Sequence, residues 1–525
     1  MWYIMEISSG GDVMDNSLFV KTMLDYIENR VAEEISADEI AGTAGFSLAH
    51  FRAVFRDATG QTLARYIAHR RLCHAASELV HTKRPVSDIA MTYYFGSHDV
   101  FIRAFKRAFG MTPSEFRQSR HPVSHRLIVP GIYGPSVSSE ESVVMNIDNV
   151  SENKKDYGML YGVVPRVSYF GQEAELTPFV SCLRACLTYM GQDISYARLM
   201  AGSGAAFRLM WNTKFWDGGN VDIMNIKEDP TEPLRRALKT AGREFVMLCK
   251  PGKEGRYVFE NSPAKMSNIK AGEKASFAEL IRNEIDCGRP LIGFGIIGPP
   301  EACIIAGYKE AGETLTGWNF FQDMPEFSAG IGKEPCGYYN RKGWYEYPET
   351  IALLAIGESL ELPEEKSFLM DTLEYALSII ETPRVNDHAG GYEAYEAWAA
   401  ALSKESEFPR DAPLPMLMER LMCQCDAMTM VGEGRWYASA FLEQEAGMFP
   451  EASSELNAAA QLYKQEHQLS MEMGRLLEGF AMSEKCAGAL AVPETRKSIA
   501  ALVRQCAVLE KKAAEHIRSA VNILK

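Results

Sequence analysis

The feature that most constrains this chain is a pattern that occurs twice in its first 120 residues. A short apolar helix, a glycine turn and a second helix that begins at serine are expected around residues 40–47, and again around residues 89–97. The second helices begin at Ser47 and Ser97. Two helices joined by a tight glycine turn are typical of helix-turn-helix motifs, whose second helix fits the major groove of DNA. The repeat predicts an all-α domain with two such units over residues 17–120.

A long amphipathic helix is predicted between the two units, over residues 63–80. Its apolar residues recur at helical spacing, and Arg65, Arg70 and Arg71 are expected on its exposed face. A further helix is expected from Ser97 onward. Its predicted core residues are Phe101, Phe105 and Phe109.

The charge of the chain is unevenly distributed. Its net charge is −14, yet residues 44–120 contain twelve Lys or Arg and five Asp or Glu, a net charge of +7, so the rest carries −21. A basic module on an acidic body is the asymmetry expected of a regulator with one DNA-facing surface. Taken alone, the positive charge of residues 44–120 has an alternative explanation, in which these side chains lie on a solvent-exposed helix face without binding DNA.

The exposed face of each second helix must supply the groups that touch DNA. In the first unit these candidates are Ser47, Ala49, His50, Arg52 and Arg56. In the second unit they are Ser97, His98, Asp99, Arg103, Lys106 and Arg107. Arginine can bind guanine in a bidentate way, whereas Lys106 and Arg107 are expected to grip phosphate. Asp99 repels phosphate, so it is expected to accept from a cytosine amine or to orient Arg103.

The segment from Phe95 to Arg117, FGSHDVFIRAFKRAFGMTPSEFR, closely resembles the signature of AraC/XylS-type transcription regulators. The resemblance covers residues 17–119. It implies two helix-turn-helix units that are joined by a long helix and read adjacent major grooves. The family's base-contacting positions fall on Ala49, His50, Arg52, His98, Asp99 and Arg103, and its structural motif falls on Phe109, Gly110, Thr112 and Pro113.

The rest of the chain divides into four further segments. Residues 1–16 are interpreted as a leader without the pattern of a signal peptide, and Met14 is an alternative start. Residues 121–157, rich in Pro, Ser and Glu, are expected to be a linker with one short strand near 127–129. Residues 158–355 are expected to be α+β, with strands near 291–297 and 302–308, and residues 356–525 to be all-α. No apolar run is long enough to span a membrane.

The segments from Cys182 to Phe207 and from Gly288 to Tyr308 resemble a papain-like, bacteriocin-processing peptidase fold. They also resemble the N-terminal domain of the butirosin biosynthesis acyltransferases. The family's nucleophile position falls near Pro178 and its histidine position on Glu301. Between His125 and His388 the sequence has no histidine, and a thiol needs a nearby imidazole to ionise. We therefore expect a pseudo-peptidase without catalytic residues, cofactor or metal.

A cleft that has lost its chemistry can still bind a small molecule. The candidate ligand-binding residues are Phe207, Trp211, Trp216, Glu301, Trp318, Phe320 and Tyr338. The alternative is that these aromatic residues are core. The helical tail resembles the same group, and it either covers this domain or dimerises the chain.

These patterns predict a cytoplasmic, sequence-specific transcription regulator controlled by a small molecule. Its eleven cysteines, an odd number without a C-x-x-C pair, are interpreted as reduced thiols. The expected partners are double-stranded DNA, a small-molecule effector, RNA polymerase and a second copy of the chain. Two alternatives stay open: a peptidase-like or acyltransferase-like enzyme fused to a DNA-binding module, and a body that serves only for dimerisation or interaction.

Overall fold

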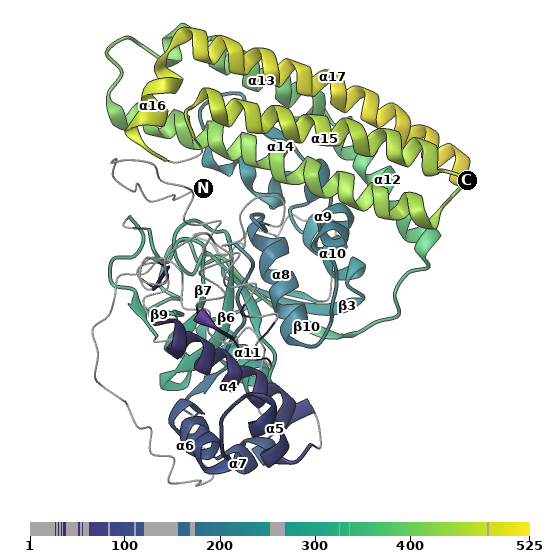
Figure 1. Cartoon of the computed structure of the whole chain (residues 1–525). Helices are drawn as coiled ribbons and strands as arrows, with labels where there is room; N and C mark the ends of the chain where they lie inside the picture. Colours follow the sequence, from purple (N-terminus) through teal and green to yellow (C-terminus); the bar gives the residue numbers. More distant parts are fainter. Residues whose placement is uncertain are drawn as a thin grey trace.

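The structure is a computed structural model, in which the described helices and strands lie within residues 62–119 and 156–525 (Figure 1). It describes residues 62–81, 84–109, 112–119, 156–167, 174–251, 268–324, 326–334, 337–479 and 482–525, with a few single residues between 27 and 55. The stretch 62–119 is called the N-terminal domain below, and the stretch 156–525 the C-terminal body. The predicted leader, the expected strand at 127–129 and nearly all of the predicted linker lie outside the described residues.

Among the described residues of the N-terminal domain every regular element is a helix. The helices are α4 (Leu63–His81), α5 (Val86–Thr92), α6 (His98–Phe109) and α7 (Pro113–Ser119). The predicted helices over 63–80 and from Ser97 onward are confirmed. The residue before α5 is Pro85, whose φ of −55° suits the residue before a helix. The domain has its own apolar core, formed by Leu72, Ala75, Ala76, Leu79, Ile89, Ala90, Tyr93, Phe101, Phe105 and Phe116.

A row of aromatic rings holds α6 against its neighbours. The ring centroids of Phe101 and Phe105 lie 5.4 Å apart, and those of Phe105 and Phe116 lie 5.2 Å apart. Phe95 reaches Phe101 from the turn before α6, at 5.0 Å. Edge-to-face aromatic pairs at such distances add to the energy of burial. The core positions of Phe101 and Phe105 are confirmed, whereas the side chain of Phe109 lies outside the described part.

The start of α7 is a reciprocal cap. The backbone N–H and the hydroxyl of Thr112 both donate to Glu115 Oε2 at 2.7 Å, and the N–H of Glu115 donates to Thr112 Oγ1 at 3.3 Å. This is a capping box, and Pro113 occupies the first helical position, where no N–H is needed. Arg117 then donates to the carbonyl oxygens of Leu79, at 3.1 Å, and Arg84, at 2.5 Å. Arg117 therefore fastens α7 to the C-terminal end of α4.

The C-terminal body contains one large mixed sheet. The strand order is β4-β3-β10-β5-β6-β7-β9-β8, with β1 beside β6. All pairs are antiparallel except β3 with β4. The strands are β1 (Gly158–Met159), β3 (Arg243–Cys249), β4 (Ile269–Ala271), β5 (Leu291–Phe294), β6 (Ala302–Lys309), β7 (Thr314–Trp318), β8 (Gly332–Lys333), β9 (Tyr339–Lys342) and β10 (Ala352–Ser359).

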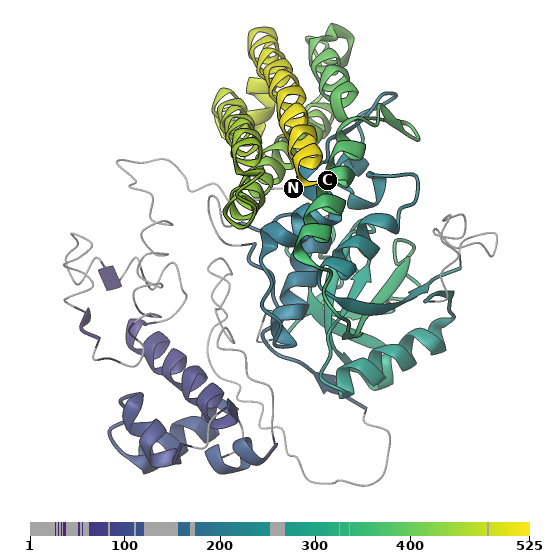
Figure 2. The ribbon, with the colours of Figure 1, turned by 90° about the vertical axis from the view of Figure 1, so that its right-hand side faces the viewer.

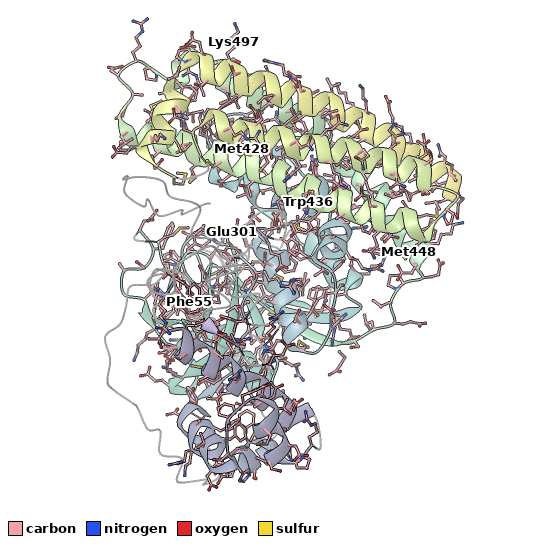
Figure 3. The ribbon with its side chains drawn as sticks, in the orientation of Figure 1. Phe55, Glu301, Met428, Trp436, Met448 and Lys497 are labelled. Carbon is pink, nitrogen blue, oxygen red and sulfur yellow. The ribbon has the colours of Figure 1, made fainter. Side chains whose placement is uncertain are left out.

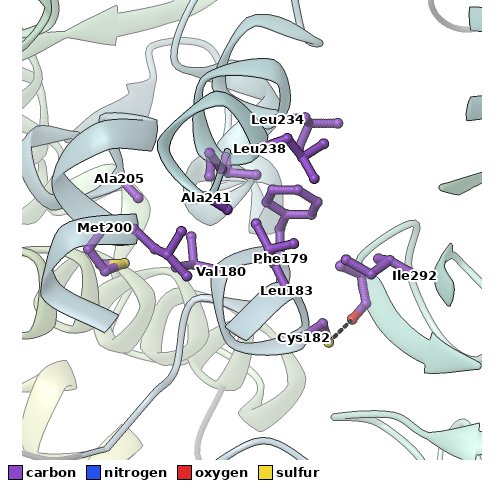
Figure 4. Packing of buried hydrophobic residues seen from close by; sticks show 14 of the residues in the cluster. Phe179, Val180, Cys182, Leu183, Met200, Ala205, Leu234, Leu238, Ala241 and Ile292 are labelled. Carbon is purple, nitrogen blue, oxygen red and sulfur yellow. Dashed lines mark hydrogen bonds between the residues drawn. The ribbon is translucent and has the colours of Figure 1, made fainter. Parts of the chain in front are cut away.

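Strand β6 shows why this sheet is buried. Its first seven residues, Ala302 to Tyr308, are all buried, so both faces of the strand are covered. Helices α8 (Pro178–Tyr189) and α11 (Lys274–Asp286) both pack against it. Figure 4 shows Phe179 and Leu183 of α8 next to Leu234 and Leu238 of α10 (Glu232–Thr240). The predicted strands near 291–297 and 302–308 are confirmed as β5 and β6.

The last third of the body is mostly helical. Its helices are α12 (Glu365–Ile380), α13 (Gly391–Ser403), α14 (Leu414–Met448), α15 (Ser453–Leu476), α16 (Glu484–Ala491) and α17 (Pro493–Leu524). The long helices α14, α15 and α17 lie side by side (Figures 1 and 2). No described helix is both long and apolar enough to span a bilayer.

The helical third is not separate from the sheet. The predicted boundary between residues 355 and 356 falls inside β10. The region expected to be all-α also contains β11 (Arg384–Val385) and β12 (His388–Gly390), and β12 pairs with β2 (Met210–Asn212). One core cluster joins residues of both parts, for example Phe207 and Tyr463, whose rings lie 6.0 Å apart.

A buried ion network crosses the helices of the body. Arg435 of α14 donates from Nη2 to Glu510 Oε2 of α17 at 2.5 Å, and its Nε lies 3.6 Å from Glu466 Oε2 of α15. All three side chains are at most 1% exposed. Tyr395 of α13 donates to Glu466 at 2.8 Å. Arg435 Nη1 also donates to the carbonyl oxygen of Arg208, at 3.1 Å. The network ties four helices to the segment that carries Arg208.

Candidate nucleic-acid interface

The turn between α5 and α6 sets the direction of the second helix. Tyr94 has φ 58° and Gly96 has φ 66°, two left-handed residues close together. The N–H of Phe95 donates to Ala90 O at 3.1 Å, which closes the turn. Glycine takes this conformation without a steric cost, which accounts for Gly96. Ser97 Oγ then accepts from the N–H of Val100 at 3.3 Å and caps α6.

Helix α6 turns one face to the core and the other to solvent. Phe101 and Phe105 are fully buried, whereas Arg103 and Lys106 are exposed. Within the described part of the chain neither cation forms an ion pair, and Arg103 Nε donates only along its own helix, to Asp99 O at 3.3 Å. Two free cations therefore project from the face opposite the core.

The N-terminal end of α6 carries three more of the predicted residues, Ser97, His98 and Asp99, all exposed. The Asp99 side chain is 89% exposed and lies 4.0 Å from His98 Nδ1. At this distance the imidazole and the carboxylate share no hydrogen bond, and both side chains are accessible to a partner. Arg107 lies in α6, but its side chain is outside the described part.

The first unit is described only in part. Arg52 is exposed, while Phe51 and Phe55 are buried beside Tyr66 of α4. Ser47, Ala49, His50 and Arg56 lie outside the described residues.

One expectation about α4 is wrong. Arg70 was expected on the exposed face, but it is only 2% exposed. Arg71 donates to Glu33 O at 2.6 Å and lies 4.9 Å from the centre of the Tyr94 ring. Both arginines are therefore held by groups of the protein itself. The expectation failed because helical periodicity alone does not reveal that another segment of the chain covers this face. The side chain of Arg65 is outside the described part.

The aromatic ligand candidates of the body fall into separate cores. Trp211 and Trp216 contact each other at 5.2 Å and belong to the core of the helical third. Trp318 and Phe320 contact each other at 4.7 Å against the core of the large sheet. Phe207 and Tyr338 are fully buried in that second core, and Tyr338 Oη accepts from Val163 N at 2.8 Å. The described contacts of these six side chains therefore lie in two separate cores.

Glu301, the remaining candidate, lies in a charged cluster that the sequence did not reveal. It is half-buried at the start of β6, close enough to Asp222 and Arg208 to affect them electrostatically. Burial, and then the Asp222 carboxyl, raises the pKa of Glu301 to about 8. Burial raises the pKa of Asp222 to about 6. Asp222 and Arg208 belong to no local motif, so no sequence signal pointed to them.

The cysteines of the body are buried thiols. Cys182 is fully buried, and its Sγ lies 3.7 Å from Ala302 O (Figure 4). Burial raises the pKa of Cys182, and also that of Cys186, well above the usual range. Burial therefore keeps the thiols of Cys182 and Cys186 protonated, the opposite of what a thiolate nucleophile needs. His388 lies near Asp217, with its Nε2 atom 3.5 Å from Asp217 Oδ2.

A short helix, a tight turn and a solvent-facing basic helix on a rigid aromatic core define a helix-turn-helix protein. The helix-turn-helix domain family matches residues 40–119. Regulatory protein SoxS of Salmonella typhimurium is 38% identical over 104 residues, which cover 20% of this chain and 97% of that protein. The chain belongs to the AraC family of DNA-binding transcription regulators.

Two other relatives match the same part of the chain. The right origin-binding protein of Escherichia coli is 39% identical over 106 residues, and the chain spans only 37% of the length of that relative. A crystal structure of a transcriptional regulator with an AraC-type DNA-binding domain, from Chromobacterium violaceum, is 25% identical. That match covers 20% of this chain and 92% of the other, with a TM-score of 0.19.

Proposed function

We propose that the chain regulates transcription by reading two successive major grooves of double-stranded DNA. The observation that carries this proposal is the exposed pair Arg103 and Lys106, which stands unpaired on a helix fixed by buried aromatic rings. A major groove admits one α-helix, and a guanidinium can bind the O6 and N7 atoms of guanine.

The two cations of α6 have different roles in this proposal. Arg103 lies one turn from the helix start and reads a base, while Lys106, a turn further along, binds phosphate. Ser97, His98 and Asp99 line the groove edge, and Arg107 adds a phosphate contact. The first unit contributes Arg52 and Arg56 with Ser47, Ala49 and His50.

Alanine substitutions separate the two roles. Arg103→Ala should weaken operator binding by about 1–3 kcal/mol and reduce the preference for operator over random duplex. Lys106→Ala should weaken binding to both duplexes equally and lower the salt slope of log K by about 1. The measurement is fluorescence anisotropy at several salt concentrations, with Lys512→Ala, an exposed change on α17, as the control. The assignment of α6 to the major groove would be wrong if Arg103→Ala left the preference for operator over random duplex unchanged and Lys106→Ala left the salt slope of log K unchanged.

We also propose that the body is a sensor built on a papain-like fold that has lost its chemistry. The fully buried, protonated thiol of Cys182 favours this reading over the cysteine-enzyme alternative. A bound effector would shift the chain between arrangements only if its affinity for them differs. A second copy of the chain and RNA polymerase are the macromolecular partners proposed beside DNA.

A further inference from the structure

We infer that Arg71 and Tyr94 form a clamp between the two helix-turn-helix units and thereby fix the angle at which the units meet DNA. Both are positioning residues in this role, and neither has to touch a base. The inference deepens the proposed reading of two successive major grooves and rests on it for the effect on DNA binding. The clamp itself belongs to the free chain, so it can also be tested without DNA.

The first argument is that the two units pack on different parts of α4. The ring of Phe55, in the first unit, lies 5.6 Å from the ring of Tyr66, near the start of α4. Figure 3 labels Phe55 beside this part of the helix. The described core of the second unit uses α4 only from Leu72 onward. Because these two described contacts share no residue, a group that reaches both units at once has the most influence on the angle between them.

Arg71 lies between these two parts of α4 and contacts both units. Its Nη2 atom donates to the backbone oxygen of Glu33 at 2.6 Å, in the segment that leads into the first unit. Its guanidinium carbon lies 4.9 Å from the centre of the Tyr94 ring, in the turn of the second unit. These distances suit a hydrogen bond and a cation–π interaction, respectively. One side chain therefore joins two segments that are far apart in the sequence.

The backbone of Tyr94 supplies the second argument. Its φ of 58° lies in the left-handed region, which is uncommon for a residue with a large side chain. Glycine takes this conformation without a steric cost, as Gly96 does. The Tyr94 side chain is also 51% exposed, so burial in the core does not account for a tyrosine here. The contact with Arg71 gives the ring a role, since strained residues gather where function requires an unusual conformation.

The position of Tyr94 connects the clamp to DNA recognition. The chain turns at Gly96 directly after it, and Ser97 then caps the start of α6. A guanidinium that is bound to the first unit and to the Tyr94 ring therefore acts on the turn from which α6 projects. A rigid pair of units meets two grooves only at one separation and rotation of the half-sites, whereas a loose pair tolerates several. The clamp thus predicts a strict half-site spacing.

The spacing of half-sites on DNA tests this role. The full chain first selects an operator from a random duplex library. Fluorescence anisotropy then measures its affinity for that operator, for each half-site alone, and for an operator with one base pair inserted between the half-sites. The insertion rotates one half-site by about 35° about the DNA axis, because a helical turn contains about 10–10.5 base pairs. The unmodified chain should lose about tenfold or more in affinity on this insertion.

Two substitutions remove the clamp in different ways. Arg71→Ala removes the guanidinium, and Tyr94→Gly removes the ring but leaves a residue that suits the φ of 58°. Each variant should bind the operator about fivefold more weakly, keep its half-site affinities within about twofold, and lose less than about threefold on the insertion. Tyr94→Phe keeps the ring and should behave as the unmodified chain does. Met91→Ala, an exposed change on α5, is the control and should also change nothing.

Electron-resonance distance measurements on the full chain test the clamp in the absence of DNA. Nitroxide-bearing amino acids replace Arg52 and Ser87, which are exposed residues of the first and the second unit. The distribution of distances between the two labels should be narrow in the unmodified chain and in Tyr94→Phe. It should be wider in Arg71→Ala and in Tyr94→Gly, because the units can then change their angle.

The two measurements separate the clamp from the regulator proposal. An equally narrow distribution in Tyr94→Gly, or an undiminished loss on the insertion in both variants, would overturn the clamp. Half-site affinities that fall as much as the operator affinity would also overturn it, since the substitutions would then damage one unit rather than the angle. If the unmodified chain selects no operator while both variants widen the distribution, the clamp stands and the regulator proposal fails.

Discussion

The two described regions place their charges in opposite ways. In the N-terminal domain the cations of α6, Arg103 and Lys106, face solvent without an ion pair. In the body the guanidiniums of Arg435 and Arg208 are at most 3% exposed. Exposed cations are available to a polyanion, whereas buried ones act on the fold around them. The exposed cations of α6 suit the recognition role proposed for the first region, whereas the buried cations of the body stabilise its internal structure.

The largest expected effect comes from breaking the buried network of the body. Glu510→Gln removes the nearest carboxylate of the buried Arg435 and leaves only Glu466, at 3.6 Å, which should lower the free energy of unfolding by about 3–5 kcal/mol. Denaturant unfolding followed by tryptophan fluorescence reports it selectively, because the chain has no tryptophan between residues 17 and 120. Glu515→Gln, an exposed position on the same helix, is the control and should change little. Equal stability of both variants would contradict the importance of the network.

The next effect concerns pH. Burial raises the pKa of Glu445 to about 7, and neither of its carboxyl oxygens has a hydrogen-bond partner. Between pH 5 and pH 8 the folded body holds a proton that the unfolded chain releases, so raising the pH favours unfolding. The free energy of unfolding of the body should therefore fall over this window, and Glu445→Gln should remove about 2–3 kcal/mol of that fall. A slope unaltered by Glu445→Gln would contradict this assignment.

The pH effect in the N-terminal domain has the opposite sign. The hydrogen bonds from Thr112 lower the pKa of Glu115 below its usual 4.5. As the pH falls, the unfolded state therefore binds a proton at this carboxyl before the folded state does. The stability that Glu115 contributes to the folded domain is thus present above pH 4.5 and is lost in acid. Stability of the two regions measured separately across pH should show these opposite slopes.

The smallest effect is local to the N-terminal domain. Thr112→Ala removes the capping hydroxyl of α7 and should destabilise that helix by about 1 kcal/mol. Hydrogen exchange in peptides from residues 86–119 should accelerate about fivefold, while the tryptophan unfolding midpoint of the body stays the same. A shift of that midpoint would show that the two regions are coupled more closely than their separate cores indicate.

Sequence reasoning succeeded where interacting residues lie close together in the chain. The cap between Thr112 and Glu115 spans three positions, and the buried Phe101 and Phe105 repeat at helical spacing. Strands β5 and β6 were predictable for the same reason, as short apolar runs joined by a glycine and proline turn. Local patterns of this kind predicted where the described helices of the N-terminal domain lie.

Sequence reasoning failed where the partner is distant. Nothing around Arg70 shows that it is buried, and nothing around His388 shows that β12 joins β2 inside an otherwise helical region. Glu301 was a candidate, but its neighbours Asp222 and Arg208 come from other elements, which only the fold brings together. The remaining candidates were chosen as aromatic side chains, and aromatic side chains also fill cores.

The position of β10 has a consequence for synthesis on the ribosome. This strand, Ala352–Ser359, lies between β3 and β5, although both are made long before it. Until it emerges, β3 and β5 each have an open edge, and such edges invite pairing with other chains. The apolar core described for the N-terminal domain lies between Leu72 and Phe116 and contains no residue of these later segments. A messenger truncated before codon 352 would thus yield a product whose first domain is finished and whose unfinished remainder depends on chaperones to stay in solution.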